Sequence, residues 1–432
     1  MANPTATRPP QPWTAPTATD PVDLGVHLPG SKSITARALV LSALADGPST
    51  LHLPLRARDT ELMAAGLRNL GIGVSTNDDN RWVVRPQPLR GPAHVDVGLA
   101  GTVMRFGPPV AGLTDGPVTF DGDPVARTRP LGPLLGALRA LGVRLDVAPT
   151  GGLPLTVHGT GRVAGGEVTI DASASSQFVS GLLLAAPRFD RGVVVRHQGP
   201  PVPSAPHLRM TTRMLRAAGA AVDDGTPDVW TVEPGRLSGR EWDIEPDLSG
   251  AVPYFAAALV TGGRVTLRGW PRNSAQPVDQ LRTLLHQLGG QVTLDAEGLT
   301  VRGTGTVHGI DADLSEVAEL TPAVAALAAL ADSPSKLRGV AHIRGHETDR
   351  LAALARELTG LGADVTETSD GLDIRPRPLH GGGFETYHDH RMAHAAAIVG
   401  LAVPGVELSD VTCTAKTQPE FPALWSAMVA GD

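Results

Sequence analysis

One pattern recurs along this chain: a helix with apolar residues spaced three and four apart ends in a glycine, and a strand follows closely. The glycines are Gly71, Gly142, Gly219, Gly289 and Gly362, so the intervals between them are 71, 77, 70 and 73 residues. A glycine at the end of such a helix is a common stop signal, but a near-constant spacing is not expected of a random globular chain. Five markers predict six structural repeats in 432 residues, the last closing with a helix over 421–428.

A second helix is predicted inside each repeat. These six segments are short, rich in Ala, Leu and Val, and apolar almost all round, so we expect them to be buried. They cover 33–44, 102–112, 176–186, 249–259, 321–331 and 391–401. Strand-like runs such as 116–120, 191–197, 263–268, 335–338 and 406–410 complete a β-α-β-α-β-β unit. The predicted fold class is α/β (α+β), and 432 residues favour two domains of three repeats each.

The bulk composition excludes several classes of protein. A formal charge of -7 without a basic tract argues against a nucleic-acid partner. No apolar run of about 18 residues and no signal-peptide pattern occurs, so we expect no membrane partner and a cytoplasmic location. The single cysteine, Cys413, excludes an internal disulfide and fits a reducing compartment. Residues 1–22 are rich in Pro and Thr around Trp13 and are predicted to form a flexible arm.

Lysine is scarce in this chain. The 37 basic residues include only Lys32, Lys336 and Lys416 as lysines, and two of these, Lys32 and Lys416, lie in turn-forming stretches of small residues. Where arginine supplies almost every other cation, a retained lysine indicates a site that needs a compact ammonium able to lose its proton. Lys336, beside the turn 332–335, is better explained by chance.

Polar residues cluster at the predicted starts of the buried helices, where free backbone N–H groups and the helix dipole favour anions. In the first repeat, Lys32, Ser33 and Arg37 follow Pro29-Gly30-Ser31 and form an anion cradle. It is not a Walker A loop, because Ser31 displaces the lysine by one position. Taken alone, the stretch fits a serine-capped helix with solvated cations equally well.

The next two repeats carry similar groups. Gly101 lets a ligand approach the backbone just before Arg105, and Arg129 follows in the same repeat. Ser175-Ser176-Gln177 opens the third buried helix, although a serine run before a helix is usually only a cap and loop.

The second half adds carboxylates to the cations. Glu316 and Glu319 precede one buried helix, charged residues and a histidine crowd into 344–350, and His388-Asp389-His390-Arg391 opens another helix. A metal site is a weak alternative for the histidines, because no further spaced ligand set accompanies them. A salt-bridged helix start is the simplest explanation of 344–350 read alone.

Together these groups predict one anion-binding cleft. Equivalent helix starts in both halves carry cations, so closing the halves would bring several positive charges to one multiply charged ligand. Without a ligand the cations would repel one another. We therefore expect the empty protein to open and the ligand to close it.

The chain resembles the 5-enolpyruvylshikimate-3-phosphate synthase family of enolpyruvyl transferases from about Leu28 to Ala427. Seven motifs in order carry the resemblance: Leu28-Pro29-Gly30-Ser31-Lys32-Ser33, Ala100-Gly101-Thr102 through Arg105, Arg129-Pro130, Ser175-Ser176-Gln177, Glu347-Thr348-Asp349-Arg350-Leu351, Asp389-His390-Arg391-Met392 and Lys416-Thr417. It implies two domains, each of three β-α-β-α-β-β units around buried parallel helices. The upper domain would span 29–243, and the lower domain 23–28 with 244–432.

The resemblance also implies the reaction and its residues. The family transfers the enolpyruvyl group of phosphoenolpyruvate to the 5-hydroxyl of shikimate 3-phosphate by addition and elimination, in the cleft between two closing domains. The residues implied for shikimate 3-phosphate are Lys32, Ser33, Arg37, Ser175, Ser176, Gln177, Ser204, Glu319, His342 and His346. Those implied for phosphoenolpyruvate are Lys32, Gly101, Arg129, Gln177, Arg350, Arg391 and Lys416. Glu319 would act at the hydroxyl and Glu347 at the methylene carbon, assisted by Lys32 and His390, with no metal and no organic cofactor.

Four residues depart from the family's usual pattern. Leu99 replaces Asn and loses an amide, His207 replaces Tyr, Glu319 replaces Asp, and His346 replaces Lys. Because an imidazole titrates where an ammonium does not, the change at His346 predicts that substrate binding falls between pH 6 and 8.

Three other functions remain as alternatives. An enolpyruvyl transferase acting on UDP-N-acetylglucosamine often uses a loop cysteine, whereas Cys413 is better explained as a small core residue, so its alkylation should leave activity intact. A non-catalytic phosphometabolite-binding protein would not need Glu319 and Glu347 beside bound anions. A P-loop kinase is disfavoured by the displaced Lys32. We expect a monomer whose partners are small molecules.

Overall fold

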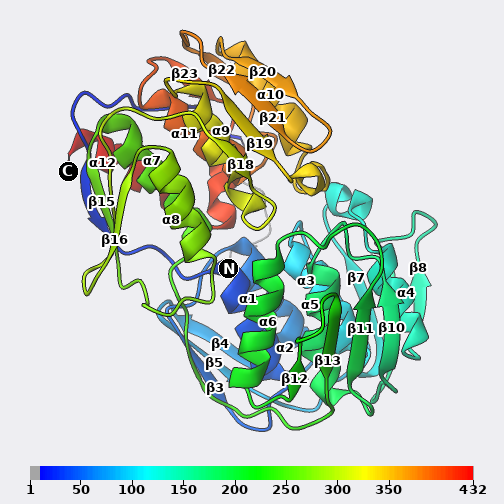
Figure 1. The fold of residues 1–432 in the computed structure, drawn as a ribbon. Helices are drawn as coiled ribbons and strands as arrows, with labels where there is room; N and C mark the ends of the chain where they lie inside the picture. The colour runs from blue at the N-terminus through cyan, green and yellow to red at the C-terminus, as the bar shows by residue number, and fades with distance from the viewer. Residues whose placement is uncertain (1–9, 432) are drawn as a thin grey trace. The chain divides into compact units, whose positions relative to one another are not determined.

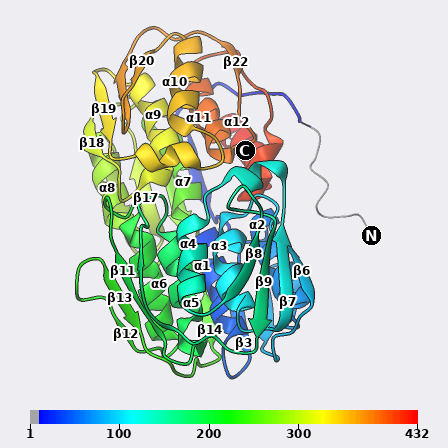
Figure 2. The same cartoon turned by 90° about the vertical axis from the view of Figure 1, so that its right-hand side faces the viewer.

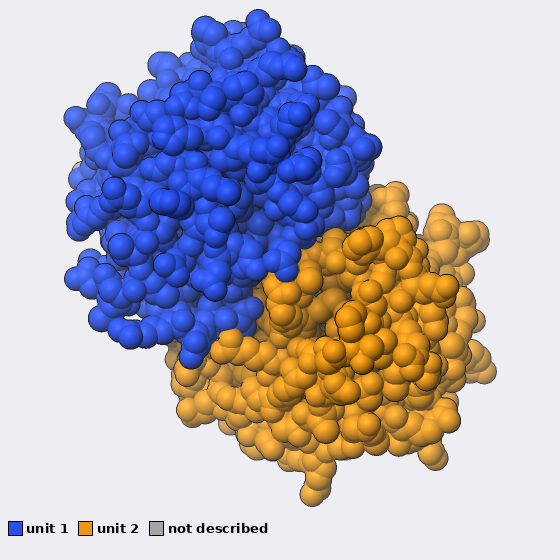
Figure 3. All heavy atoms as spheres, in the orientation of Figure 1, with its two compact units in different colours: residues 1–29, 245–432 blue, residues 30–244 orange. Residues whose placement is uncertain are grey.

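The computed structural model describes residues 10–431 and divides the chain into two compact units (Figure 3). One, here called the contiguous unit, is Gly30–Ile244. The other, the split unit, joins the segment ending at Pro29 to the segment starting at Glu245. Both divisions fall one residue after the predicted ones at 28/29 and 243/244.

The contiguous unit contains three four-stranded sheets with one common pattern, in which the first pair of strands is parallel and the other pairs are antiparallel. The first sheet is ordered β14 (Glu241–Asp243), β3 (Ser49–His52), β5 (Arg81–Arg85), β4 (Gly73–Asp78). The second is β6 (Ala93–Asp96), β7 (Asp115–Asp121), β9 (Leu155–Thr160), β8 (Arg144–Val147). The third is β10 (Gly166–Ile170), β11 (Val193–His197), β13 (Val229–Val232), β12 (Val222–Asp223).

Three inner helices of this unit pack against one another: α1 (Lys32–Ala43), α3 (Gly101–Ala111) and α5 (Gln177–Ala185). Nearly all of their residues are buried, because these segments have no polar face to present to water. Figures 1 and 2 show them between the sheets. Three amphipathic outer helices accompany them: α2 (Arg58–Asn69), α4 (Gly132–Ala140) and α6 (Ala205–Ala217). The short 3-10 helices η1 (Pro124–Thr128) and η2 (Ala186–Arg188) complete the unit.

The split unit repeats the same plan. Its first sheet is ordered β16 (Gln291–Leu294), β17 (Gly298–Arg302), β15 (Arg264–Arg268), β2 (Asp23–Val26). The second is β18 (Asp311–Asp313), β19 (Ser335–Arg338), β21 (Leu372–Arg375), β20 (Asp364–Glu367). The third has three strands, β1 (Trp13–Thr14), β23 (Val406–Leu408), β22 (Gly382–Phe384).

The inner helices of the split unit are α7 (Leu248–Thr261), α9 (Thr321–Ala329) and α11 (His390–Gly400), which contact one another. Its outer helices are α8 (Val278–Gln287), α10 (Arg350–Gly360) and α12 (Phe421–Ala430), and its 3-10 helices are η3 (Ala318–Leu320), η4 (Ala341–Gly345) and η5 (Thr412–Lys416). All six predicted buried helices are present. Each lies within two residues of its predicted bounds.

In two sheets, the edge strand that pairs in parallel comes from a distant part of the chain. In the split unit β2 pairs in parallel with β15, and in the contiguous unit β14 pairs in parallel with β3. Each of these two strands lies next to a point where the chain passes between units. The repeat pattern predicted six units but not this exchange of strands.

The N-terminal segment differs from the predicted flexible arm. Residues 1–9 lie outside the described part, but Trp13–Thr14 pairs antiparallel with β23 at Leu408 and Glu407. The backbone N–H of Ala15 donates to Val406 O at 2.9 Å, and Gly400 leaves room for the Ala15 methyl group. Trp13 and Thr14 therefore form an edge strand of the sixth sheet, in the place that an antiparallel strand of the repeat's own fills elsewhere.

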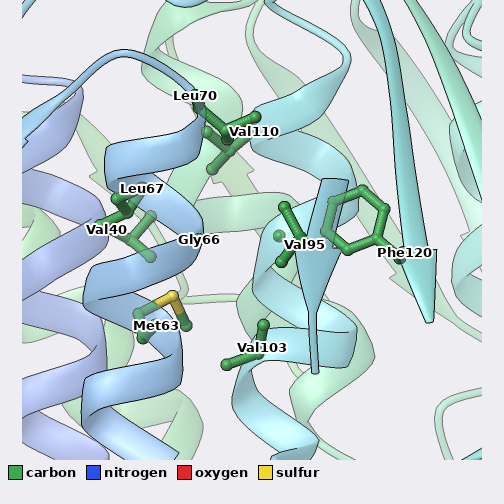
Figure 4. A pocket seen from close by; sticks show the side chains of 10 residues that line it. Val40, Met63, Gly66, Leu67, Leu70, Val95, Val103, Val110 and Phe120 are labelled. Carbon is green, nitrogen blue, oxygen red and sulfur yellow. The ribbon is translucent and has the colours of Figure 1, made fainter. Parts of the chain in front are cut away.

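A small apolar cavity lies in the core of the contiguous unit, among α1, α2, α3 and β7 (Figure 4). Its lining includes Val40, Met63, Val103 and Phe120, and its volume is about 10 Å³. That is room for one water molecule at most, and the lining side chains offer no hydrogen bond. The cavity is a packing defect and is too small for an organic ligand. Within the described residues, no helix combines the length and apolarity needed to cross a bilayer.

Candidate functional site

Several of the predicted site residues lie at the N-terminal ends of the inner helices. Lys32, Gly101 and Gln177 are the first residues of α1, α3 and α5, and His390 is the first residue of α11. Backbone N–H groups in a first helical turn have no partner within the helix, and the dipole there favours anions. The repeat therefore presents equivalent anion-attracting ends within each unit, and each unit carries one half-site.

Arg37 is the central cation at the start of α1. Its side chain is 1% exposed and lies 5.2 Å from the centre of the Phe106 ring. It donates to neutral oxygens only, at Thr211 Oγ1 (2.8 Å), Ser33 O (3.0 Å), Ser180 Oγ (3.3 Å) and His207 O (3.2 Å). Burial lowers the pKa of Arg37 to about 9, which still leaves the guanidinium charged at neutral pH. Among the described residues no carboxylate pairs with Arg37, so its positive charge is available to attract an anion.

Lys32 precedes Arg37 on the same helix and is held differently. Its Nζ lies 3.6 Å from Asp59 Oδ2, and its side chain is 19% exposed. An ammonium that is partly exposed keeps access to a ligand, as a group with a predicted role in both binding and catalysis requires.

Two guanidinium groups converge on the backbone of Gly101. A Cβ atom at this position would lie 2.7 Å from Arg105 Nη1 and 3.2 Å from Arg129 Nη2, so any other residue would displace these guanidinium groups. Arg129 donates to the Leu99 carbonyl oxygen at 2.9 Å, and Arg105 donates to Gln177 Oε1 at 3.1 Å. Arg129 is held by the backbone carbonyl group of residue 99, which any amino acid at this position would provide. The contact therefore does not need the side-chain amide that is lost where Leu99 replaces Asn.

The serine-rich segment lies at the start of α5. Ser176 is 4% exposed, and the backbone N–H of Gln177 donates to Ser175 Oγ at 3.2 Å. Ser204, which immediately precedes α6, has φ of 54°, a left-handed conformation that serine rarely adopts. Such strain is concentrated at ligand sites in proteins. The strain therefore agrees with the predicted role of Ser204 in binding.

Arg350 is the hub of the half-site in the split unit. Its side chain is 0% exposed and meets three carboxylates: Asp389, at 2.7 and 3.2 Å, Glu319, at 3.0 Å, and Glu347, at 2.9 Å. Burial disfavours the charged form, but these carboxylates, Asp389 first, raise the pKa of Arg350 above its ordinary value. Asp389 also accepts from the backbone N–H of Arg391 at 2.9 Å and so fixes the start of α11. Asp389 stood in a predicted motif without a predicted role.

Glu319 is shared by two cations. Its Oε2 lies 2.5 Å from Arg391 Nε and 3.0 Å from Arg350 Nη1. Burial opposes ionisation of this carboxyl group, but Arg391 and Arg350 outweigh it and hold the pKa of Glu319 well below its ordinary value. Glu319 is therefore a carboxylate at neutral pH. Arg391 also donates to Ser249 Oγ at 3.0 Å.

Glu347 links Arg350 to Lys416. Its Oε1 contacts Lys416 Nζ, its Oε2 accepts from Arg350, and its side chain is 11% exposed. Lys416 ends η5 and is 6% exposed. The two residues predicted from separate motifs, 69 positions apart, are thus in direct contact. His390 is 2% exposed, with Nδ1 3.5 Å from Asp389 Oδ1.

The pairing of these charges corrects one expectation. We predicted that the cations would repel one another in the empty protein. In the split unit, however, Arg350, Arg391 and Lys416 are each paired with a carboxylate of the same unit. Their mutual repulsion is therefore largely neutralised without any ligand. The sequence showed the carboxylates but not how close they lie to the cations.

The structure also overturns the predicted pH effect of His346. Burial, followed by the repulsion of Arg350, lowers the pKa of His346 to about 3, although Glu319 acts in the opposite direction at 3.5 Å. Burial likewise lowers the pKa of His342, whose ring contacts that of His346. The imidazole of His346 is therefore neutral between pH 6 and 8. We predicted that the exchange of Lys for His would make substrate binding fall over this window, and a pKa of about 3 contradicts that prediction.

Cys413 has no place in either half-site. Burial raises the pKa of its thiol far above the ordinary value, and the thiol donates to Asp410 O at 3.2 Å. A nucleophilic cysteine needs the opposite shift. Within the described part of the chain, no three His, Cys, Asp or Glu side chains are placed to share a metal ion.

Besides Asp389, two residues of the site were missed. Arg105 was part of a predicted motif but had no predicted role, although it meets Gly101 and Gln177. Ser249 was noted only as the start of a helix. A serine in the first turn of a helix is common as a capping residue, so its sequence context carried no signal of its contact with Arg391.

Comparisons with known proteins agree with the geometry. A family model described as EPSP synthase (3-phosphoshikimate 1-carboxyvinyltransferase) matches residues 16–425. A curated relative from Mycobacterium ulcerans (strain Agy99), named 3-phosphoshikimate 1-carboxyvinyltransferase, is 54% identical over 430 residues, which are 98% of each chain.

Solved structures confirm the predicted fold class. An EPSP synthase from Acinetobacter baumannii superposes with a TM-score of 0.81 at 24% identity, covering 97% of this chain and 98% of that one. The enolpyruvyl transferase NikO from Streptomyces tendae has a TM-score of 0.76 at 18% identity over the same shares. At these identities the two structures support the fold alone.

Proposed function

This chain belongs to the EPSP synthase family, and we propose that its two half-sites divide the work of one reaction. As a 3-phosphoshikimate 1-carboxyvinyltransferase, it transfers the enolpyruvyl group of phosphoenolpyruvate to the 5-hydroxyl group of shikimate 3-phosphate and releases phosphate. The assignment of individual residues to the steps of this reaction is the content of the proposal.

Shikimate 3-phosphate is assigned mainly to the contiguous unit. Its ligands there are Lys32, Ser33, Arg37, Ser175, Ser176, Gln177 and Ser204, and the split unit adds Glu319, His342 and His346. Arg37 supports this assignment, because a buried cation surrounded by neutral oxygens favours an anionic ligand. The neutral imidazole of His346 can offer hydrogen bonds but no charge. Burial lowers the pKa of His342 and so disfavours its charged form.

Phosphoenolpyruvate is assigned to cations of both units. Its ligands are Lys32, Gly101, Arg129, Gln177, Arg350, Arg391 and Lys416. Gly101 supports this assignment, because its missing side chain leaves the guanidinium groups of Arg105 and Arg129 open to a small anion. Two planar guanidinium groups suit the bidentate recognition of phosphate and carboxylate groups.

Glu319 is proposed to take the proton from the 5-hydroxyl group as its oxygen attacks C2 of phosphoenolpyruvate. The carboxylate form that Arg391 and Arg350 enforce is the form a base needs. The methylene carbon gains a proton in the same step, and we assign its delivery to Glu347. Loss of that proton and departure of phosphate then complete the transfer, with the cations stabilising the departing anion. Lys32 and His390 assist.

The contact between Glu347 and Lys416 carries this assignment. A bound phosphate group would take over the pairing of Lys416 and Arg350, which now neutralise Glu347. Glu347 would then be free to hold the proton that it delivers. The binding of one substrate would thus prepare the acid for the next step, without a metal or an organic cofactor.

The test is to mix the purified protein with both substrates and measure phosphate release. Release with shikimate 3-phosphate but not with UDP-N-acetylglucosamine is expected. No release at micromolar enzyme would contradict the function. Glu319→Gln and Glu347→Gln should each abolish release while phosphoenolpyruvate still binds, and retained activity in either variant would overturn its role. A non-catalytic binding protein would bind both ligands without releasing phosphate.

We also propose that the enzyme works as a monomer in the cytoplasm, with small molecules as its partners and without nucleic acid or membrane. The single cysteine and the formal charge of -7 support this setting. Light scattering of the purified protein at micromolar concentration tests the first point, since a mass of about 90 kDa would indicate a dimer of the 44.8 kDa chain.

A further inference from the structure

Ser249, the second residue of α7, lies between a carboxylate and a substrate-site cation of the split unit. Its hydroxyl group donates to Asp247 Oδ1 at 2.6 Å, and its oxygen accepts from Arg391 Nη2 at 3.0 Å. From these contacts we infer that Ser249 is a positioning residue for Arg391. The inference rests on the proposed role of Arg391 in binding phosphoenolpyruvate.

The direction of the hydrogen bonds is fixed by chemistry. An ionised carboxylate can only accept, so the single proton of the Ser249 hydroxyl group points to Asp247. The lone pairs of the Ser249 oxygen then face Arg391, whose guanidinium group can only donate. A hydroxyl group that donates to a carboxylate is also a stronger acceptor, because hydrogen bonds in a chain polarise one another. Asp247 therefore acts on Arg391 through Ser249.

Asp247 is itself held by several hydrogen bonds. Its carboxylate accepts from the backbone N–H of Gly250 at 2.9 Å, which caps α7, and from the Ser249 hydroxyl group. Its backbone N–H donates to Pro29 O at 3.0 Å. Because the cap uses the Gly250 N–H group and not the serine hydroxyl group, loss of that hydroxyl group should leave the start of α7 in place.

The neutral partner matters for the charge on Arg391. Its Nε meets Glu319, which is proposed to act as a base, while its Nη2 meets the uncharged Ser249. A second carboxylate at Nη2 would hold the guanidinium group equally well, but it would add another negative charge where phosphoenolpyruvate is proposed to bind. Ser249 thus orients Arg391 without adding to the charge of Glu319.

Ser274 provides a matched control in the same unit. Its hydroxyl group donates to Glu245 Oε2 at 2.6 Å, the same distance as in the pair of Ser249 and Asp247. Ser274→Ala therefore removes an equivalent serine–carboxylate bond at a residue to which we assign no part in the site. Ser249→Thr keeps the hydroxyl group and should rescue what Ser249→Ala loses.

The experiment measures phosphoenolpyruvate binding by calorimetry together with both KM values. Ser249→Ala should weaken phosphoenolpyruvate binding about tenfold, as expected for loss of one hydrogen bond to a charged group. The KM for shikimate 3-phosphate and the Tm should stay near wild type. For Ser249→Thr and Ser274→Ala, the dissociation constant of phosphoenolpyruvate should stay within about twofold of the wild-type value.

The inference would be overturned if Ser249→Ala bound phosphoenolpyruvate as tightly as wild type, or if Ser274→Ala weakened this binding as much as Ser249→Ala does. A parallel loss of affinity for both substrates with a lower Tm would show a purely structural role and would also overturn it. Wild-type protein that binds phosphoenolpyruvate but releases no phosphate would contradict the proposed function alone, because the binding comparison does not depend on turnover.

Discussion

Arg350→Gln should destabilise the split unit by about 4 kcal/mol at pH 7.5, because breaking a buried ion pair by removing one partner costs about 3–5 kcal/mol. Arg350 and Asp389 are both 0% exposed, so Asp389 would be left buried without its cation. The bonds to Glu347 and Glu319 involve partners that are 11% and 31% exposed, and water can replace part of them. The estimate therefore rests on Asp389.

Urea-induced unfolding measures this loss of stability, and hydrogen exchange locates it. Amides of α10 and α11 should exchange faster in the variant, whereas those of the contiguous unit should not change. Arg344→Gln is the matched control: Arg344 is 28% exposed and its partners Asp349 and Glu367 are 43% and 37% exposed. Removing such exposed pairs should cost less than about 1 kcal/mol.

The pH dependence gives a second check on Arg350→Gln. The folded-state pKa of Glu319 is depressed, so its contribution to stability is present above its unfolded pKa, about 4.3, and is lost as pH falls through and below that value. Arg350 supplies part of that depression, so the difference between wild type and variant should stay level from pH 7.5 to about 5 and shrink as pH falls from about 5 to about 3. A difference below about 1 kcal/mol at pH 7.5, or one that grows below about pH 5, would refute the reasoning.

Three further predictions follow from the structure. Because the pKa of His346 is about 3, His346→Gln should change the affinity for shikimate 3-phosphate by the same factor at pH 6 and pH 8. If the ratio of the variant and wild-type dissociation constants differed between these pH values, the imidazole would titrate in this window and the prediction would be wrong. Lys336→Arg should be silent in the phosphate-release assay, whereas Lys32→Arg and Lys416→Arg should each cost activity; equal rates in all three variants would remove the lysines' special role. Gly136→Ala should raise the free energy of unfolding by about 1 kcal/mol, since this exposed glycine lies inside α4 and a Cβ there meets nothing within 4 Å; urea unfolding that shows a loss would contradict this.

The inner helices could be predicted from the sequence because their signal is local. A run such as Thr321–Ala329 is apolar on every side, so it belongs inside a protein whatever surrounds it. The glycines at their regular spacing marked where the outer helices end. Local signals of this kind do not depend on knowing which distant segment lies opposite.

The failures all involve contacts between distant segments. Trp13 pairs with Leu408, nearly the full chain away, and a two-residue strand has no pattern of its own. The pKa of His346 depends first on burial in the folded unit and then on the charges of Glu319 and Arg350, and the sequence does not show how these groups are placed. The contact between Ser249 and Arg391 spans 142 positions. Residue types at the site were thus predictable, but their pairing and protonation were not.

The strand pairings impose an order on the folding of this protein during its synthesis. β2 and β1 leave the ribosome first, yet their partners β15 and β23 are made only after residues 264 and 406. The contiguous unit can fold as soon as β14 emerges, since every strand of its three sheets lies between residues 30 and 244. The N-terminal segment must wait unpaired through most of synthesis. A bulky domain fused ahead of Trp13 would therefore slow the pairing of the N-terminal strands, which is the last folding step, and not the folding of the contiguous unit.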